Sequence, residues 1–119
     1  MLKLSHKTLD VYQIALKLVN DVYNVTRQFP KEEQYIIVTQ LRRAAISVCS
    51  NIAEGAARIS KFEKKRFYEI ARSSVVEIDT QFEIAANLRY LQNIDIKSLE
   101  NHLISVFRIL CKMIDNLDK

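Results

Sequence analysis

The chain has 119 residues, 49% of them hydrophobic, and a net charge of +4. This length fits a single domain over residues 1–119 that can bury a core without disulfides, and the apolar content argues against disorder. One glycine and one proline leave too little turn chemistry for an all-β fold, so an all-α chain is expected.

The N-terminal residues lack the apolar core of a secretory signal, and no stretch approaches the roughly 18 apolar residues of a membrane span. We therefore expect a cytoplasmic protein with no membrane partner. In a reducing compartment its two cysteines, Cys49 and Cys111, are expected to be buried free thiols. A disulfide between them is the less favoured alternative.

The first helix is predicted over residues 8–28, because apolar residues recur there at alternating spacings of four and three, as in bundle helices. These residues are Val11, Ala15, Leu18, Val22, Val25 and Phe29. Pro30 ends this helix, since proline disfavours helical geometry in the residue before it. A second helix is predicted over residues 31–57, with Glu32 and Glu33 near its positive end and Gly55 loosening its last turns.

The third helix is predicted over residues 60–91, where Ser60 and Glu63 form a capping-box pattern. The fourth is predicted over residues 95–117, with Asp95 as its N-cap and a regular apolar repeat behind it. Short connections between consecutive helices favour antiparallel neighbours. The sequence therefore predicts an antiparallel up-down-up-down four-helix bundle.

Two of these helices carry more apolar residues than one core face requires. The surplus in the fourth helix is Ile104, Phe107, Cys111 and Ile114, and that in the first is Tyr12, Leu16, Val19 and Tyr23. A wide core face within one copy is one interpretation. We favour the other, in which a homo-oligomer buries the surplus, because large exposed apolar patches are uncommon in monomers.

The second helix has a narrow polar stripe among small and apolar residues, made of Gln40, Ser47, Asn51, Glu54 and Arg58. The third helix has a counterpart in Ser74, Glu77 and Gln81. Buried polar groups need hydrogen-bond partners. We therefore predict a structural polar network in which Ser47, Asn51 and Glu54 face Ser74, Glu77 and Gln81, with a ligand site as the alternative.

The charge of the chain is concentrated in residues 58–72, which hold six basic and two acidic side chains and so carry the whole net charge. The basic residues are Arg58, Lys61, Lys64, Lys65, Arg66 and Arg72. Arg42 and Arg43 are candidates to extend this segment or, alternatively, to pair with acidic residues inside the oligomer. Lys61, Lys65 and Arg72 are expected to share one outward stripe. Clustered lysines and arginines suit sequence-tolerant binding of nucleic-acid phosphates, and an ordinary solvated surface is the alternative.

Signs of catalysis are few. His6 and His102 have no second histidine or cysteine at ligand spacing, and one glycine cannot build a phosphate-binding loop. Glu54 and Glu77 suggest a di-metal site, but the Glu-x-x-His elements of such bundles do not occur. We therefore expect no enzymatic activity, no cofactor and no metal.

Five sequence blocks carry a resemblance to a known family: Leu9-Asp-Val-Tyr-Gln-Ile-Ala15, Gln40-Leu-Arg-Arg-Ala-Ala-Ile-Ser47, Ser50-Asn-Ile-Ala-Glu-Gly55, Arg58-x-Ser60-x-x-Glu63 and Glu77-x-x-x-Gln81. With them the chain resembles the small bacterial four-helix bundle proteins encoded in intervening sequences of large-subunit (23S) ribosomal RNA genes. The resemblance spans residues 9–91. It departs at Cys49, where the family often has proline, and at Ala56-Ala57 after the glycine.

The resemblance implies an antiparallel bundle that assembles into a ring-like homopentamer, with no established enzymatic activity. A related branch comprises the accessory variability proteins of diversity-generating retroelements, which are basic pentameric barrels that bind nucleic acid and associate with a reverse transcriptase. The family's motif positions in this chain are Arg42, Arg43, Ser47, Asn51, Glu54, Gly55, Glu77 and Gln81. The resemblance assigns none of them a role.

Two functions remain open from the sequence. The first is a non-enzymatic oligomer that binds RNA or DNA weakly and without sequence preference, on structured RNA or beside a reverse transcriptase. The second is a protein-protein interaction scaffold with no nucleic-acid role. A small enzyme is a third interpretation with no candidate triad behind it.

Overall fold

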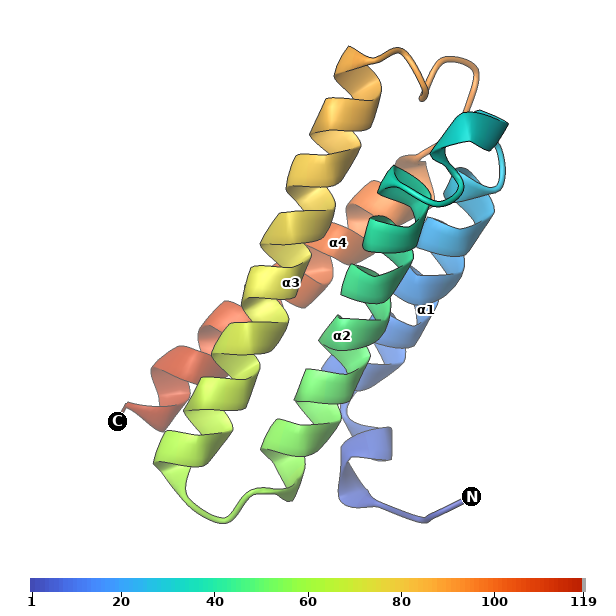
Figure 1. The fold of residues 1–119 in the computed structure, drawn as a ribbon. Coiled ribbons are helices and arrows are strands. Elements are labelled where there is room, and N and C mark those ends of the chain that lie inside the picture. The colour runs from blue at the N-terminus through green and yellow to red at the C-terminus, as the bar shows by residue number, and fades with distance from the viewer. Residues whose placement is uncertain (119) are drawn as a thin grey trace.

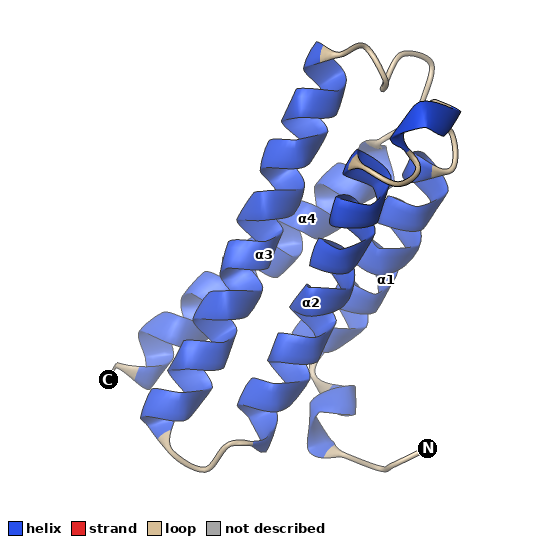
Figure 2. Cartoon of the chain, viewed as in Figure 1, coloured by secondary structure: helices blue, strands red, loops and turns tan. Residues whose placement is uncertain are grey.

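The computed structural model describes residues 1–118, and this part of the chain is helical apart from its connections, with no β-strand (Figure 2). The four α-helices are α1 Asp10–Thr26, α2 Ile37–Ala57, α3 Lys61–Asn87 and α4 Lys97–Leu117. Two short 3-10 turns, η1 Ser5–Thr8 and η2 Lys31–Glu33, precede α1 and α2. The prediction of an all-α chain with four helices is confirmed.

None of the helices in residues 1–118 combines the length and the apolar character needed to cross a bilayer.

The helices surround a shared core. Each packs against the next along the chain, and α1 also packs against α4 (Figure 1). The contact between α2 and α3 is the most extensive of these. The α1–α2 and α3–α4 connections lie at one end of the molecule, whereas the N-terminus, the α2–α3 connection and the end of α4 lie toward the other (Figure 1).

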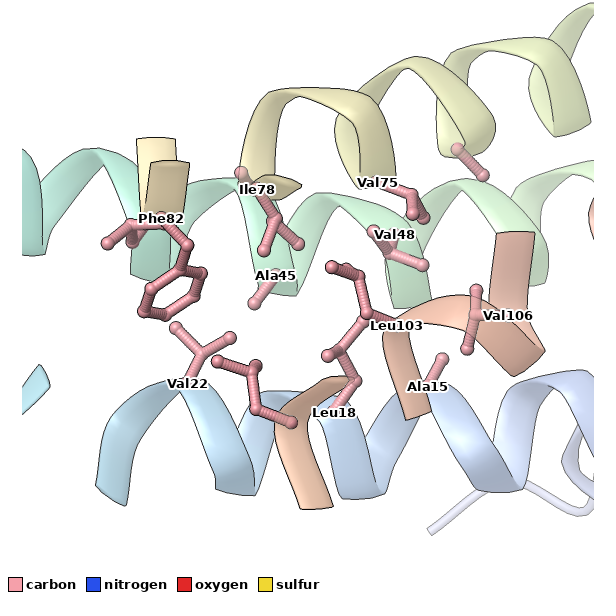
Figure 3. Close-up of a cluster of buried hydrophobic side chains, with 14 of the residues drawn as sticks. Ala15, Leu18, Val22, Ala45, Val48, Val75, Ile78, Phe82, Leu103 and Val106 are labelled. Atoms are coloured by element: carbon pink, nitrogen blue, oxygen red, sulfur yellow. The ribbon is translucent and has the colours of Figure 1, made fainter. Parts of the chain in front are cut away.

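Apolar side chains from all four helices interlock in the core, among them Leu18, Val48, Ile78 and Val106, which are fully buried (Figure 3). Removing a side chain of the size of leucine or isoleucine from water contributes about 1.5–3 kcal/mol to stability. All six apolar positions predicted for the first helix are buried. The spacing of four and three in the sequence therefore identified the core face of α1.

The predicted start of the second helix is wrong, because α2 begins at Ile37 and not at residue 31. Pro30 has extended backbone (ψ 146°), and the residues after it form the 3-10 turn η2. Ile36, at φ −120° and ψ −99°, then interrupts the helical geometry once more. The chain uses this segment to cross from α1 to α2, so Glu32 and Glu33 lie near the start of η2 instead.

The predicted end of the third helix is also wrong, because α3 ends at Asn87 and not at residue 91. The amide of Tyr90 donates to the carbonyl of Ala85 at 2.9 Å, and that of Arg89 donates to Ala86 at 3.0 Å. This pair of bonds is the Schellman motif, which requires a left-handed residue at the position that Arg89 occupies with φ 67°. Glycine is the usual residue there, so an arginine at this position did not indicate that the helix stops.

Three of the remaining helix boundaries differ from the predictions by two residues, the start of α3 differs by one, and the ends of α2 and α4 are as predicted. α1 is Asp10–Thr26 where residues 8–28 were predicted, and α4 begins at Lys97, two residues after the predicted N-cap. Asp95 still serves the start of α4, because its carboxylate accepts from the amide of Lys97 at 3.0 Å. At the start of α3 the hydroxyl of Ser60 accepts from the amide of Glu63 at 3.1 Å, as the capping-box pattern predicted.

Candidate nucleic-acid interface

Hydrogen bonds tie α2 to α3 near the middle of the pair. The hydroxyl oxygens of Ser47 and Ser74 are 2.9 Å apart, and either hydroxyl can donate. The Asn51 side-chain amide donates to the Ser47 carbonyl at 2.9 Å and to its hydroxyl at 3.0 Å. The structure thus brings together three of the six residues of the predicted polar network, and they satisfy one another.

A second polar contact lies nearer the start of α2. The Gln81 side-chain amide donates to the side-chain oxygen of Gln40 at 3.0 Å and to a carboxylate oxygen of Glu77 at 3.2 Å. The structure does not join Glu54 to this contact, because Glu54 is exposed and forms an ion pair with Arg58 at 3.0 Å. The predicted network is therefore two separate contacts, and the second uses Gln40, which sequence reasoning placed on the stripe but not in the network.

Gly55 lets the end of α2 approach α3 closely. A Cβ atom at this position would lie 2.6 Å from Cε1 and 2.8 Å from Cδ1 of Tyr68, whose side chain is buried. The Lys64 ammonium then donates to the carbonyls of Ala56 at 3.1 Å and of Gly55 at 3.4 Å. These are among the last carbonyls of α2, where the regular bonding of the helix ends and the Gly55 carbonyl accepts from the amide of Arg58 at 3.2 Å, so Lys64 adds to the cap of that helix.

The two arginines at the start of α2 lie apart from the rest of the basic candidates. Arg42 donates to the Thr26 hydroxyl at 3.0 Å, and its guanidinium lies over the Tyr23 ring at 4.4 Å, so it fastens α2 to α1. Arg43 is exposed. Arg43 and Arg58 are fifteen positions apart along α2 and its C-cap, which is about 22 Å along the helix axis. Arg42 and Arg43 therefore do not extend the basic segment.

Two basic residues of α3 lie against α4. The Lys65 ammonium pairs with both carboxylate oxygens of Asp118 at 3.0 and 3.2 Å, and hydrogen bonding to that carboxylate raises the pKa of Lys65. Arg72 is half-buried and donates to the Cys111 sulfur at 3.6 Å. The expectation of an outward stripe of Lys61, Lys65 and Arg72 is therefore wrong, because the last two face a neighbouring helix.

Three basic residues remain together on the surface at the α2–α3 connection: Arg58, Lys61 and Arg66, which we call the basic end. The guanidinium of Arg58 lies 4.7 Å from the Phe67 ring centroid and that of Arg66 lies 6.0 Å from it. Both distances fall within the range of cation–π attraction. Lys61 and Arg66 are exposed, and neither forms an ion pair with any of residues 1–118.

Sequence reasoning missed a polar cluster between α1 and α4. The Asp21 carboxylate accepts from the Ser98 hydroxyl at 2.8 Å through one oxygen and lies 2.6 Å from Nδ1 of His102 through the other. Ser98 and His102 are four residues apart on one face of α4, which is the signal that could have pointed to it. In a nucleophilic triad the imidazole stands between hydroxyl and carboxylate and uses both nitrogens. Here Asp21 contacts both partners and the same nitrogen faces both, so the cluster fastens two helices.

The cysteines are half-buried free thiols. Burial raises the pKa of the Cys49 thiol to about 11, so little thiolate is present near neutral pH. Cys111 has the Arg72 contact described above. Among the described residues no three His, Cys, Asp or Glu side chains gather closely enough to hold a metal ion.

Comparison with known proteins places the chain in a family. The family model of the 23S rRNA-intervening sequence proteins matches residues 7–112. The chain belongs to this family. No curated protein matches the sequence.

A solved structure supports the same assignment at the level of the fold. It is the crystal structure of a protein of unknown function from the S23 ribosomal protein family of Bacteroides thetaiotaomicron VPI-5482. The two chains are 18% identical and superimpose with a TM-score of 0.78, over 88% of this chain and 95% of the other. At this identity the likeness shows the fold alone.

The motif residues of this 23S rRNA-intervening sequence protein concentrate at the contact between α2 and α3. Ser47, Asn51, Gly55 and Gln81 all act in the contacts described above. In this chain the motif therefore holds two helices in close register. The basic end lies beside this contact, at the connection between the same two helices.

Proposed function

We propose that this family member is a non-enzymatic, homo-oligomeric accessory protein that binds nucleic acid weakly and without sequence preference through the basic end. The observation that carries the proposal is the exposure of Lys61 and Arg66, which have no ion-pair partner among residues 1–118. Cations of this kind gain free energy from phosphates by releasing counterions. Arg58 adds a third cation, partly offset by Glu54.

An apolar groove between α3 and α4 supports the oligomeric part of the proposal. Val76, Ile104 and Phe107 are 50%, 52% and 40% exposed along it. The groove has a volume of about 510 Å³, and Leu103, Asp79 and Arg108 also line it. We infer that a second copy covers this groove. An up-down-up-down protomer in a ring-like homopentamer is the form implied by the resemblance, and a ring would gather several basic ends and raise avidity.

The absence of enzymatic activity is part of the same proposal. The Asp21 cluster has the residue types of a hydrolase triad but not their order in space, as described above. The high pKa of the Cys49 thiol also argues against a role for that side chain as a nucleophile near neutral pH. Both observations favour a structural use of the residues that catalysis would need.

The test is binding of a fluorescent RNA measured by anisotropy over a range of salt concentrations. The wild-type protein is expected to lose affinity linearly in log salt, and Lys61→Ala with Arg66→Ala to flatten that slope by about 0.7–0.9 for each phosphate contact removed. A matched control is Lys31→Ala with Lys97→Ala, which removes the same charge at the opposite end of the molecule. Equal losses in the two double variants would show that net charge acts and the basic end does not.

The groove also favours a second candidate, a scaffold that binds another protein. Under that function the groove receives a partner helix, and nucleic acid is not retained at any salt concentration. A wild-type protein that is monomeric by light scattering and binds no RNA at low salt supports the scaffold and removes the first proposal.

A further inference from the structure

A large aromatic side chain stands in solvent beside the basic end. Phe62, in the first turn of α3, is 76% exposed. It follows Lys61 directly and precedes Arg66 by four residues, so the Phe62 and Arg66 side chains are neighbours on one face of the helix. An exposed phenyl ring does nothing for the stability of the fold. Because the ring lies between two cations without ion-pair partners, this surface suits a ligand that has both an apolar face and negative charge.

Unpaired nucleotides have this combination. Each base offers a flat π-face and each linkage a phosphate, and sequence-tolerant single-strand binding uses aromatic side chains for the first and lysines and arginines for the second. In a duplex the bases are stacked on one another, so an exposed ring on a helix surface finds no free face. The ring and its two cations thus fit a single strand better than a double helix.

The direction of the cluster argues for a strand and against a flat anionic surface. Lys61, Phe62 and Arg66 follow one another along α3, with about 6 Å of helix axis between Phe62 and Arg66. A plane lying across the end of the molecule would reach the α2–α3 connection, where Ile59 is 98% exposed, before it reached Arg66. Around the helix axis Lys61 and Arg66 lie on opposite sides of Phe62, about 100° and 40° from it, so a strand that crosses the first two turns of α3 obliquely contacts all three residues.

We propose that the Phe62 ring stacks on an unpaired base of single-stranded nucleic acid while Lys61 and Arg66 contact its phosphates. The inference rests on the proposed nucleic-acid binding and narrows it to a substrate class. It assigns to Phe62 a contribution that does not depend on salt, because stacking releases no counterions.

The test compares variants of Phe62 on a single-stranded oligonucleotide of about 12 nucleotides and on its duplex. Phe62→Ala and Phe62→Leu are expected to weaken single-strand binding at least about fivefold, with an unchanged salt slope and unchanged duplex binding. Phe62→Tyr keeps a ring and is expected to bind as the wild type does. Lys61→Ala is the contrasting variant, since it is expected to lower the single-strand salt slope by about 0.7.

Ile59→Ala is the matched control for loss of an exposed apolar side chain without loss of a ring. Its single-strand affinity is expected to equal that of the wild type. If Phe62→Leu binds single strands as well as the wild type does, while Lys61→Ala still weakens binding, base stacking is ruled out and the proposed function survives. If the wild type binds no nucleic acid at all, the stacking inference and the proposed function are both contradicted.

Two further measurements separate the other occupants of this surface. The first is binding to phosphatidylserine vesicles. If the wild type binds them and Phe62→Ala and Ile59→Ala weaken that binding equally, the cluster is a membrane-binding surface and the inference is overturned. A change in particle mass by light scattering in Phe62→Ala would assign the ring to contacts between copies, with the same consequence. Unchanged mass and no vesicle binding, together with the single-strand effect, support the assignment.

Discussion

The contact of α3 with α2 and its contact with α4 follow different rules. Toward α2, the helix is held by small and polar groups: Ser74 meets Ser47, and Tyr68 packs where Gly55 has no side chain. Toward α4, larger apolar residues such as Ile104 and Phe107 leave a groove that solvent reaches. The first contact is complete within one copy, whereas the second has apolar surface left over. The α2 side of α3 therefore sets the register within one copy, and under the proposed function the α4 side makes the contact between copies.

The largest expected effect breaks the close contact of α2 with α3. Gly55→Ala adds a methyl group within 2.6 Å of the Tyr68 ring, and overpacking of this kind costs about 1–3 kcal/mol. We expect a fall of that size in the free energy of unfolding by urea, although alanine is the better helix former. In a Tyr68→Leu background the cost should shrink, because the ring is gone. An equal cost in both backgrounds would show that the close approach does not explain the glycine.

A smaller effect is expected from the hydroxyl pair. Ser47→Ala and Ser74→Ala each remove one side of a half-buried hydrogen bond, which costs about 0.5–1.5 kcal/mol. The double variant should lose less than the sum of the two single losses, because the bond between the two hydroxyls can be lost only once. Thr80→Ala, on the exposed face of α3, is the control and should change unfolding little. Strict additivity of the two serine variants would contradict a direct bond.

The smallest effect on stability is expected in the groove. Ile104→Lys replaces a side chain that is already half exposed, so the free energy of unfolding should change by less than about 0.5 kcal/mol. Its effect should appear in the particle mass measured by light scattering, since a lysine in a buried contact between copies is costly. Ile104→Leu, which keeps the apolar surface, should assemble like the wild type. A lysine variant of unchanged mass would place the contact between copies elsewhere.

The sequence predicted the structure best where a residue's position depends only on which face of its helix it occupies. The core positions of α1, from Val11 to Val25, followed from spacing alone because each must face the same core. The start of α2 and the end of α3 could not be predicted in this way, because Ile36 and Arg89 adopt backbone geometries that are unusual for their residue types. These boundaries depend on how far the chain must travel between helices, which is a tertiary property.

The candidate site shows the same division. That Ser47 and Ser74 need partners could be inferred from polar residues on otherwise apolar faces, but that Gln81 meets Gln40 depends on the offset of α2 against α3. Periodicity placed Lys65 and Arg72 on one stripe of α3 and could not show that α4 lies against it. Phe62 was passed over because an isolated exposed aromatic residue has no periodic signal at all.

The contact between α1 and α4 has a consequence for how the molecule is made. These helices are the first and last of the four, so α1 leaves the ribosome long before its second neighbour exists. At about 5–20 residues per second, roughly 4 to 14 s pass between completion of α1 and the first residue of α4. During that interval α2 and α3 can pack against their neighbours in sequence, while the face of α1 that will contact α4 stays exposed to water. The nascent chain is therefore most prone to wrong associations just before its final helix emerges.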